Sequence, residues 1–268
     1  MNEIAYSKWK AQMMAHAKPT RTPICATFEL TPRCNLDCKM CYVHNQDSNG
    51  LREKELSTET WKRIFDEAYD SGMLFATLTG GECLLRADFK ELYLHLWNKR
   101  VYMTVFTNGV LLNEEYVKFF KRYKPRKIQI SLYGSDEAGY MRVTGHRGFE
   151  KTVTAIRRLQ EEGIHVEVAI TLSSYMKEDY ISILRYCKEN GFQYKARDFA
   201  LIGNRSDAGK KDYFFKLLLR LFPELCHYIN IMICDEQCPL SAFLLVYLKV
   251  GHDLLKWKLE GIADVMKQ

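Results

Sequence analysis

Three cysteines, Cys34, Cys38 and Cys41, follow directly after the apolar, β-branched run Ile24–Leu30. Their spacing is Cys-x3-Cys-x2-Cys. Three thiolates can hold three irons of a [4Fe–4S] cluster and leave the fourth iron without a protein ligand. Such an open iron can bind a small molecule through an amine and a carboxylate. The spacing therefore predicts a cluster that serves as a chemical reagent and not only as an electron carrier.

Two other interpretations of the same cysteines remain open at this point. Spacings of four and three residues would put the thiols on one face of a helix, as a small buried stripe. Pro32 and the weak helix formers Asn35 and Asp37 argue against a helix in this segment. Zinc is the second alternative, because His44 would supply a fourth ligand at a suitable spacing.

A second candidate site follows the strand-like run Met73–Thr79, which ends in Gly80-Gly81-Glu82. Paired glycines at the carboxyl end of a strand let the backbone come close to a ligand. The Glu82 carboxylate can accept hydrogen bonds from an ammonium group. Taken alone, the motif is equally a turn with a surface acid. Its position one β–α unit after the cysteine loop favours a ligand site.

Strand-like and helix-like segments alternate along residues 24–205. The predicted strands are Ile24–Leu30, Met73–Thr79, Val101–Thr107, Lys127–Leu132, His165–Leu172 and Phe192–Ile202. The predicted helices run from Ser57 up to Gly72 and over Ala87–Lys99, Asn113–Tyr123, Phe149–Glu162 and Lys177–Asn190. Six β-then-α units with short connections predict a parallel sheet covered by helices, which binds ligands at the carboxyl ends of its strands. Periodicity alone does not distinguish a doubly wound sheet from an incomplete barrel.

The remaining residues divide into an N-terminal extension, residues 1–23, and a C-terminal appendage, residues 206–268. We expect the appendage to be helical over Lys210–Tyr228 and Ala242–Gln268. The extension lacks the apolar core of a signal peptide, and the apolar run Cys238–Leu248 is too short to cross a bilayer. Nine cysteines without an export signal indicate a reducing compartment. We therefore expect a cytoplasmic protein with no membrane partner.

The net charge of +6 is modest for 268 residues. One basic cluster stands out, formed by Lys121, Arg122, Lys124, Arg126 and Lys127. An ordinary solvated surface explains this cluster, and the alternative is a binding site for an acidic peptide or for RNA. Aromatic residues do not alternate with these charges as they do on a platform for stacking bases, so we expect no nucleic-acid partner.

Together, the cysteine loop and the Gly-Gly-Glu motif resemble the radical S-adenosylmethionine (radical SAM) enzymes over about residues 24–205. The resemblance implies that Cys34, Cys38 and Cys41 ligate a [4Fe–4S] cluster. It also implies that S-adenosylmethionine is a second cofactor. The residues that match family positions beside this cofactor are Gly80, Gly81 and Glu82 at its amino group, Tyr42 after the third cysteine, Asn108 after the third strand, Ser131 at its ribose or carboxylate, and Arg142 at its carboxylate.

The family fold is a partial (β/α)6 barrel, similar to a TIM barrel, which agrees with the independent count of six units. We therefore expect this barrel over residues 24–205, followed by the helical appendage. The implied chemistry is reductive cleavage of S-adenosylmethionine to a 5′-deoxyadenosyl radical, which abstracts hydrogen from a substrate.

The segment Ser131–Gly145 resembles the peptide-modifying branch of the family. It predicts a maturase or cross-linking enzyme that acts on a peptide or protein. We expect a reductant such as flavodoxin or ferredoxin. The alternatives are a small-molecule substrate in cofactor or antibiotic synthesis, a structural zinc-binding or interaction protein, and an inactive relative.

The sequence departs from that branch in three places. Cys83 stands where proline often follows Gly-Gly-Glu, and Tyr133 stands where aspartate is usual. The branch also carries a C-terminal SPASM or Twitch domain with auxiliary clusters. Only Cys226, Cys234 and Cys238 occur in the corresponding region, at spacings of eight and four. We therefore expect a truncated cysteine domain without an auxiliary cluster.

Overall fold

The computed structural model describes residues 3–41, 55–172, 174–176 and 179–198. All of these residues fall within one compact unit, Met1–Asn230. The predicted appendage, with Cys226, Cys234 and Cys238, lies outside the described residues, as do Tyr42 and His44.

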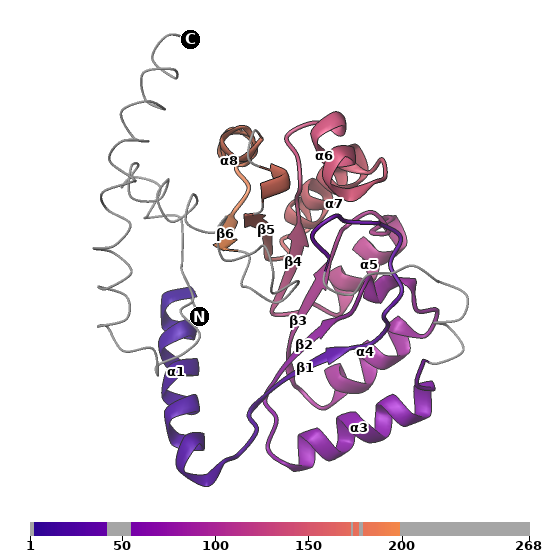
Figure 1. The fold of residues 1–268 in the computed structure, drawn as a ribbon. Coiled ribbons are helices and arrows are strands. Elements are labelled where there is room, and N and C mark those ends of the chain that lie inside the picture. The colour runs from indigo at the N-terminus through magenta and orange to yellow at the C-terminus, as the bar shows by residue number, and fades with distance from the viewer. Residues whose placement is uncertain (1–2, 42–54, 173, 177–178, 199–268) are drawn as a thin grey trace, which may run out of the picture. The chain divides into compact units, whose positions relative to one another are not determined.

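Six strands form one sheet, which runs through the centre of Figure 1. All neighbouring strands are parallel, and their order in the sheet is their order in the chain. The strands are β1 (Cys25–Glu29), β2 (Phe75–Thr79), β3 (Tyr102–Thr107), β4 (Lys127–Ser131), β5 (Val166–Leu172) and β6 (Tyr194–Asp198).

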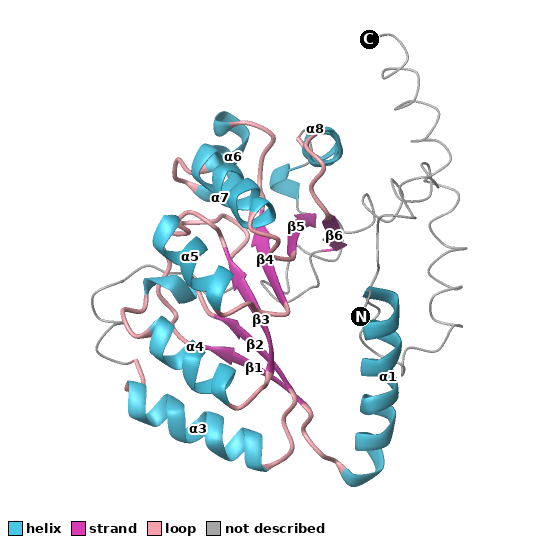
Figure 2. Cartoon of the chain, turned by 180° about the vertical axis from the view of Figure 1, so that it is seen from behind, coloured by secondary structure: helices cyan, strands magenta, loops and turns pink. Residues whose placement is uncertain are grey.

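Helices follow the strands and lie along one side of the sheet, as Figure 2 shows from behind. They are α3 (Thr58–Asp70), α4 (Phe89–Asn98), α5 (Glu114–Arg122), α6 (Glu137–Thr144), α7 (Phe149–Glu161) and α8 (Tyr180–Glu189), with the short 3-10 helices η1 (Cys83–Leu85) and η2 (Ser174–Met176). Local sequence sets several starts: the side chains of Ser57, Asn113 and Asp136 each accept a backbone N–H of the first turn that follows. None of the described helices has the length and apolar character needed to cross a bilayer.

The strand order decides the fold class. A doubly wound sheet reverses its strand order at a switch point and so receives helices on both faces. Here the order advances by one strand each time, from β1 at one edge to β6 at the other. A right-handed crossover repeated in this way returns every helix to the same face. The predicted partial (β/α)6 barrel is confirmed, and its sheet is open between β1 and β6.

The core lies between the sheet and these helices. Phe28 of β1 contacts Trp61 and Phe65 of α3, with ring centroids 6.1 and 4.8 Å apart. Leu78 of β2 and Val105 of β3 are fully buried on the same face. Because side chains alternate along a strand, the residues between them belong to the opposite face. That face carries polar side chains, including the register partners Thr27, Thr77 and Thr104.

The N-terminal helix α1 (Glu3–Thr20) is an element that the sequence analysis did not predict. It packs where the strands begin. Trp9 lies 5.5 Å, centroid to centroid, from both Phe75 and Tyr102, the first residues of β2 and β3. The Arg126 guanidinium, just before β4, lies 3.9 Å from the centre of the Tyr6 ring. Aromatic contacts therefore hold α1 at the end of the barrel opposite to the two motifs.

The predicted basic cluster is largely engaged within the chain. Lys121 pairs with Glu162 at 2.5 Å, and Lys127 pairs with Glu167 at 2.9 Å. Arg126 contacts Tyr6 and donates a hydrogen bond to His165 Nδ1. Most of these charges therefore serve contacts between neighbouring elements.

Replacing Trp9 by alanine tests whether α1 stabilises the barrel. The Trp9→Ala change removes three aromatic contacts of a partly buried ring, two of them to the sheet, and should lower the free energy of unfolding by about 2 kcal/mol. Met14→Ala in the same helix is the matched control, because Met14 is 49% exposed, and it should change stability by less than about 0.5 kcal/mol. Urea unfolding followed by circular dichroism measures both. Equal effects of the two changes would contradict the packing role of α1.

Candidate functional site

The cysteine loop after β1 lies against the Gly-Gly-Glu turn after β2. Leu30 N–H donates to Thr79 O at 2.9 Å and continues the ladder of the two strands. Beyond it, Gly81 N–H donates to Thr31 O and Glu82 N–H donates to Arg33 O, both at 2.7 Å. Backbone hydrogen bonds thus join two segments that lie about fifty residues apart in the chain.

Both glycines are needed for this close approach. A Cβ atom at Gly80 would lie 2.4 Å from Thr31 O, and one at Gly81 would lie 2.4 Å from Arg33 O. Gly80 also has φ +150°, which side chains rarely adopt. The sequence predicts that the glycines let the backbone approach a ligand. In the described structure they admit the cysteine loop itself, and their contact with a cofactor stays a prediction.

Residues 31–41 form bends and turns and no helix. This finding rejects the alternative of a buried helical stripe of cysteines. The loop is anchored instead by the C-terminal end of α6, because Asp37 N–H donates to Thr144 O and Lys39 N–H donates to Val143 O. Cys41 N–H donates to Cys38 O within the loop.

The three thiols lie in one electrostatic environment. Burial raises the pKa of Cys34 to about 11, and the nearby charges of Glu82 and Cys41 contribute to this rise. Burial raises the pKa of Cys38 to about 12, helped by the charges of Cys34 and Cys41. The Cys34 and Cys38 thiols are therefore protonated at neutral pH, and a bound metal would favour their thiolate forms.

Three thiols on one loop fit in number and type the three protein ligands of a [4Fe–4S] cluster. Tetrahedral zinc holds sulfurs about 2.3 Å from the metal and hence about 4 Å apart. Within the described part of the chain, no three Cys, His, Asp or Glu side chains converge closely enough to hold one metal ion. A [4Fe–4S] cube has its irons at separate corners and takes its cysteines further apart. Three mutually interacting thiols on one turn-rich loop suit that geometry.

Asn108, directly after β3, contacts the cysteine loop. Its Nδ2 donates to Cys34 Sγ at 3.8 Å and to Asn35 Oδ1 at 2.8 Å. Its Oδ1 accepts the Val110 N–H at 3.0 Å, which fixes the amide orientation. Hydrogen bonds to cluster sulfurs raise reduction potentials, so this amide is placed to influence a cluster on Cys34. The structure thus brings the predicted cofactor residue Asn108 to the cysteine loop, whose role as metal ligand stays a prediction.

Glu82 is fully buried and hydrogen-bonded within the chain. Its Oε1 accepts from Thr107 Oγ1 at 2.8 Å and from Leu84 N–H at 3.1 Å. Its Oε2 accepts from Asn108 N–H at 2.7 Å. Burial raises its pKa, and these hydrogen bonds oppose the rise. Glu82 therefore joins the ends of β2 and β3, and its predicted role at an amino group stays a prediction.

Ser131 and Arg142 lie further along the sheet. Ser131 ends β4 on the face away from the helices, opposite Ala169 of β5. Arg142 on α6 has 48% of its side chain exposed, and its Nη2 donates to Asp179 Oδ2 at 2.5 Å. Arg142 thus pairs with a carboxylate of this chain, and its predicted pairing with a cofactor carboxylate stays a prediction.

Two tyrosines near the thiols were missed as neighbours of the site. Burial raises the pKa of Tyr133, with further contributions that include the charges of Cys38 and Cys41. Burial also raises the pKa of Tyr140, and the nearby charges of Cys38, Glu82 and Cys34 add to the rise. Tyr133 was noted only as a departure from a family pattern. Its position directly after β4, where the other site loops also lie, was the available signal.

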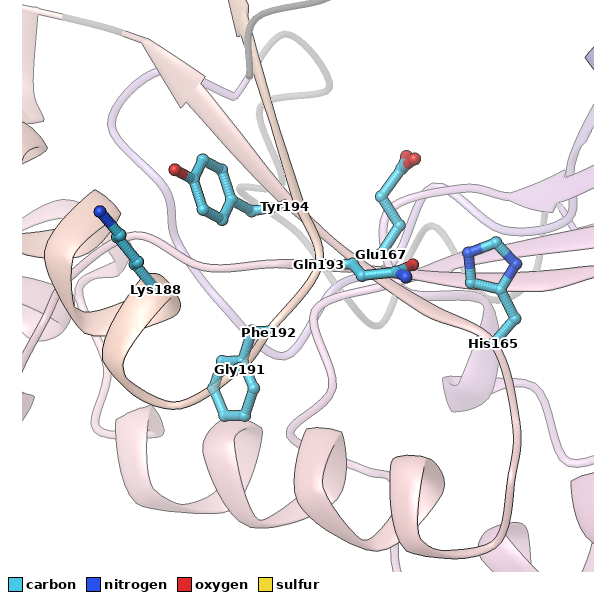
Figure 3. Close-up of a pocket in the computed structure, with 7 residues that line it drawn as sticks. All are labelled: His165, Glu167, Lys188, Gly191, Phe192, Gln193 and Tyr194. Atoms are coloured by element: carbon cyan, nitrogen blue, oxygen red, sulfur yellow. The ribbon is translucent and has the colours of Figure 1, made fainter. Parts of the chain in front are cut away.

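A cavity of about 540 Å³ lies elsewhere, where β5 and β6 begin. Figure 3 shows Gln193 directed toward His165, while Tyr194 points to the other side of the strand. In a parallel sheet the starts of the strands lie opposite their carboxyl ends. This cavity is therefore separate from the cysteine loop and is no part of the candidate site.

An open parallel barrel with a three-cysteine loop at the carboxyl end of its first strand defines a class of iron–sulfur enzyme folds. The family model of the radical SAM superfamily matches residues 28–187. The chain belongs to this superfamily.

Two curated relatives come from Bacillus subtilis (strain 168). The sporulation killing factor maturation protein SkfB is 30% identical over 190 residues, which is 70% of this chain and 45% of the relative. The subtilosin biosynthesis protein AlbA is 34% identical over 152 residues, which is 56% of this chain and 33% of the relative. The chain thus matches less than half the length of either relative.

Among solved structures, Streptococcus suis SuiB bound to S-adenosylmethionine has a similar fold. The TM-score is 0.63 at 18% identity, and the match covers 90% of this chain and 58% of SuiB.

The close approach at Gly81 predicts that Gly81→Ala is strongly destabilising. The added Cβ would overlap Arg33 O, so we expect a loss of about 3 kcal/mol of unfolding free energy. Gly191→Ala is the control, because Gly191 has φ +67° but nothing within 4 Å of its added Cβ, and it should cost about 1 kcal/mol. Thermal unfolding of the metal-free chain measures both variants. A Gly81 variant as stable as the Gly191 variant would contradict the contact.

The buried carboxylate predicts that Glu82→Ala destabilises the chain before any cofactor is bound. The change leaves the N–H groups of Leu84 and Asn108 without their acceptor, at a cost of about 3 kcal/mol. Glu67→Ala is the control, because the Glu67 side chain is 72% exposed. Urea unfolding of the two metal-free variants distinguishes them. Equal midpoints would show that Glu82 has no structural role.

Proposed function

We propose that this chain is the catalytic barrel of a radical SAM maturase that modifies a peptide or protein. The observation that supports it most directly is the backbone contact between the cysteine loop and the Gly-Gly-Glu turn. This contact puts three thiols and a glycine-lined turn at the carboxyl end of the sheet, where α/β folds bind ligands.

Cys34, Cys38 and Cys41 would hold the [4Fe–4S] cluster, and Gly80, Gly81, Glu82, Ser131 and Arg142 would bind S-adenosylmethionine beside it. When bound, the two cofactors supply an electron and a 5′-deoxyadenosyl radical that abstracts hydrogen. The chain's own residues do the rest. Asn108 orients Cys34 through its amide, and the buried ends of β2 and β3 hold the turn rigid.

The peptide substrate is supported by the relatives. SkfB is named for maturation of the sporulation killing factor and AlbA for biosynthesis of the bacteriocin subtilosin, and SuiB has been solved bound to the precursor peptide SuiA. The polar face of the sheet, lined by Thr27, Thr77 and Thr104, supplies hydrogen-bonding groups for such a substrate. A flavodoxin- or ferredoxin-type protein would supply the electron.

Anaerobic reconstitution with iron and sulfide tests the cofactor assignment. We expect about four irons per chain and a broad absorbance near 400 nm, because three cysteines hold one [4Fe–4S] cluster.

With dithionite and S-adenosylmethionine, the wild type should release 5′-deoxyadenosine, measured by mass spectrometry. Cys38→Ala should release less than about one hundredth as much, because the cluster loses a ligand. Cys187→Ala, which removes a buried thiol of α8, is the control and should retain activity. Equal release by the wild type and Cys38→Ala would refute the proposal.

A heat-treated extract of the source organism tests the substrate class. We expect a fraction of this extract to increase 5′-deoxyadenosine release above the basal rate. Prior digestion of that fraction with a protease should abolish the increase if the substrate is a peptide. Stimulation that survives digestion would contradict the peptide assignment and favour a small-molecule substrate.

A further inference from the structure

Glu55 lies between two arginines beside the cysteine loop. Its Oε1 accepts from Arg33 Nε at 2.7 Å, and its Oε2 accepts from Arg33 Nη2 at 3.1 Å. The hydroxyl of Thr31 also donates to Oε1. Arg86 Nη1 lies 3.6 Å from Oε2. One carboxylate therefore joins the side chains of two loop residues, Thr31 and Arg33, to Arg86 in the segment after β2.

These charges are largely withdrawn from water. The side chains of Arg33, Glu55 and Arg86 are 16%, 10% and 5% exposed. Burial tends to raise the pKa of Glu55, but hydrogen bonds from Arg33 and Thr31 and the charges of both arginines outweigh it and lower the pKa. Exposed ion pairs contribute little to stability, whereas removing one partner of a buried pair leaves an uncompensated charge. Removing one member of this network should therefore lower the stability of the loop measurably.

Arg86 extends the network to the surrounding backbone. Its Nη1 donates to Leu30 O at 3.0 Å, and its Nη2 donates to Leu56 O at 3.1 Å. Its guanidinium also pairs with Asp88 at 2.7 Å. Thr31 and Arg33, whose side chains Glu55 binds, are also the residues whose carbonyls accept the N–H groups of Gly81 and Glu82. The network thus supports the contact between the two motifs.

The network also determines the charge next to the predicted cluster ligand Cys34. Arg33 directly precedes the predicted cluster ligand Cys34 in the chain, and its guanidinium is paired with Glu55. Positive charge favours the reduced, more negative cluster, and net charge is one of the factors that set cluster potentials. Glu55 offsets this charge through two hydrogen bonds to the Arg33 guanidinium.

We propose that Glu55 is a positioning residue for the cysteine loop, which holds Thr31 and Arg33 in place and balances the charge of Arg33 beside the cluster. Its positioning role stands on the contacts described, and its charge-balancing role rests on the proposed function. The two roles have separate readouts.

The positioning role is tested on the metal-free chain by hydrogen exchange at the amides of Gly81 and Glu82. Glu55→Gln keeps the shape of the side chain but removes its charge, and it should speed exchange at both amides about tenfold or more. Glu67→Gln removes the carboxylate of an exposed ion pair with Arg63 and should leave both amides unchanged. If Glu55→Gln fails to fold, Arg33→Gln serves in its place with the same expectation. Exchange within twofold of the wild type would refute the positioning role.

The charge role is tested on the reconstituted protein by redox titration monitored by electron paramagnetic resonance. With iron content retained, Glu55→Gln should raise the reduction potential and Arg33→Gln should lower it. The double variant should return close to the wild-type value, and Glu67→Gln should not change it. A purely structural role would not give shifts of opposite sign that cancel.

Unchanged potentials, or shifts of both single variants in one direction, would refute the charge role. If the wild type binds no cluster, the proposed function fails and the charge role fails with it. The exchange rates at Gly81 and Glu82 would still decide the positioning role.

Discussion

The site depends on one close backbone contact, between residues 31–33 of the cysteine loop and residues 80–82 after β2. Two hydrogen bonds of 2.7 Å make it, and the absence of a Cβ at Gly80 and Gly81 permits it. A loop with three cysteines has many conformations, and ordering it costs conformational entropy. Hydrogen bonding to the end of a neighbouring parallel strand offsets this cost and gives the loop a fixed location on the barrel.

Buried polar groups around this contact are matched to one another. Glu82 accepts hydrogen bonds from Thr107, Leu84 and Asn108, so a carboxylate without exposure has its oxygens satisfied. Glu55 performs a similar task on the other side of the loop with Arg33 and Arg86. A buried polar group that lacks a partner destabilises the fold, whereas a network in which every group is paired makes its surroundings rigid. A rigid surrounding is what a site needs if it is to hold a reactive centre in one place.

The open barrel separates stability from chemistry. Its apolar face packs against the helices with fully buried residues such as Leu78 and Val105, and α1 packs where the strands begin. The opposite face is polar, and the motifs lie at the carboxyl ends of the strands. Among the described residues, the sheet does not close between β1 and β6. Membership of the radical SAM superfamily accounts for this division.

The sequence by itself determined the strand and helix pattern of the barrel and both motifs. Alternation of apolar residues, capping residues such as Ser57 and Asn113, and glycines after helices are local signals, so the predicted boundaries of most described elements lie within about two residues of those observed. The cysteine spacing and the Gly-Gly-Glu turn could also be recognised from the sequence, because each is contained in a few consecutive residues. α1 was missed, since its packing depends on aromatic partners at the starts of β2 and β3.

Only the tertiary structure decided how these pieces meet. Strand order, and with it the choice between a barrel and a doubly wound sheet, depends on pairings between residues far apart in the chain. The same holds for the partners of Glu82, for the pairing of Arg142 with Asp179, and for the network of Glu55 with Arg33 and Arg86. In each case a charged group is satisfied by donors from other elements, and the identity of those donors is fixed by packing and not by spacing along the sequence.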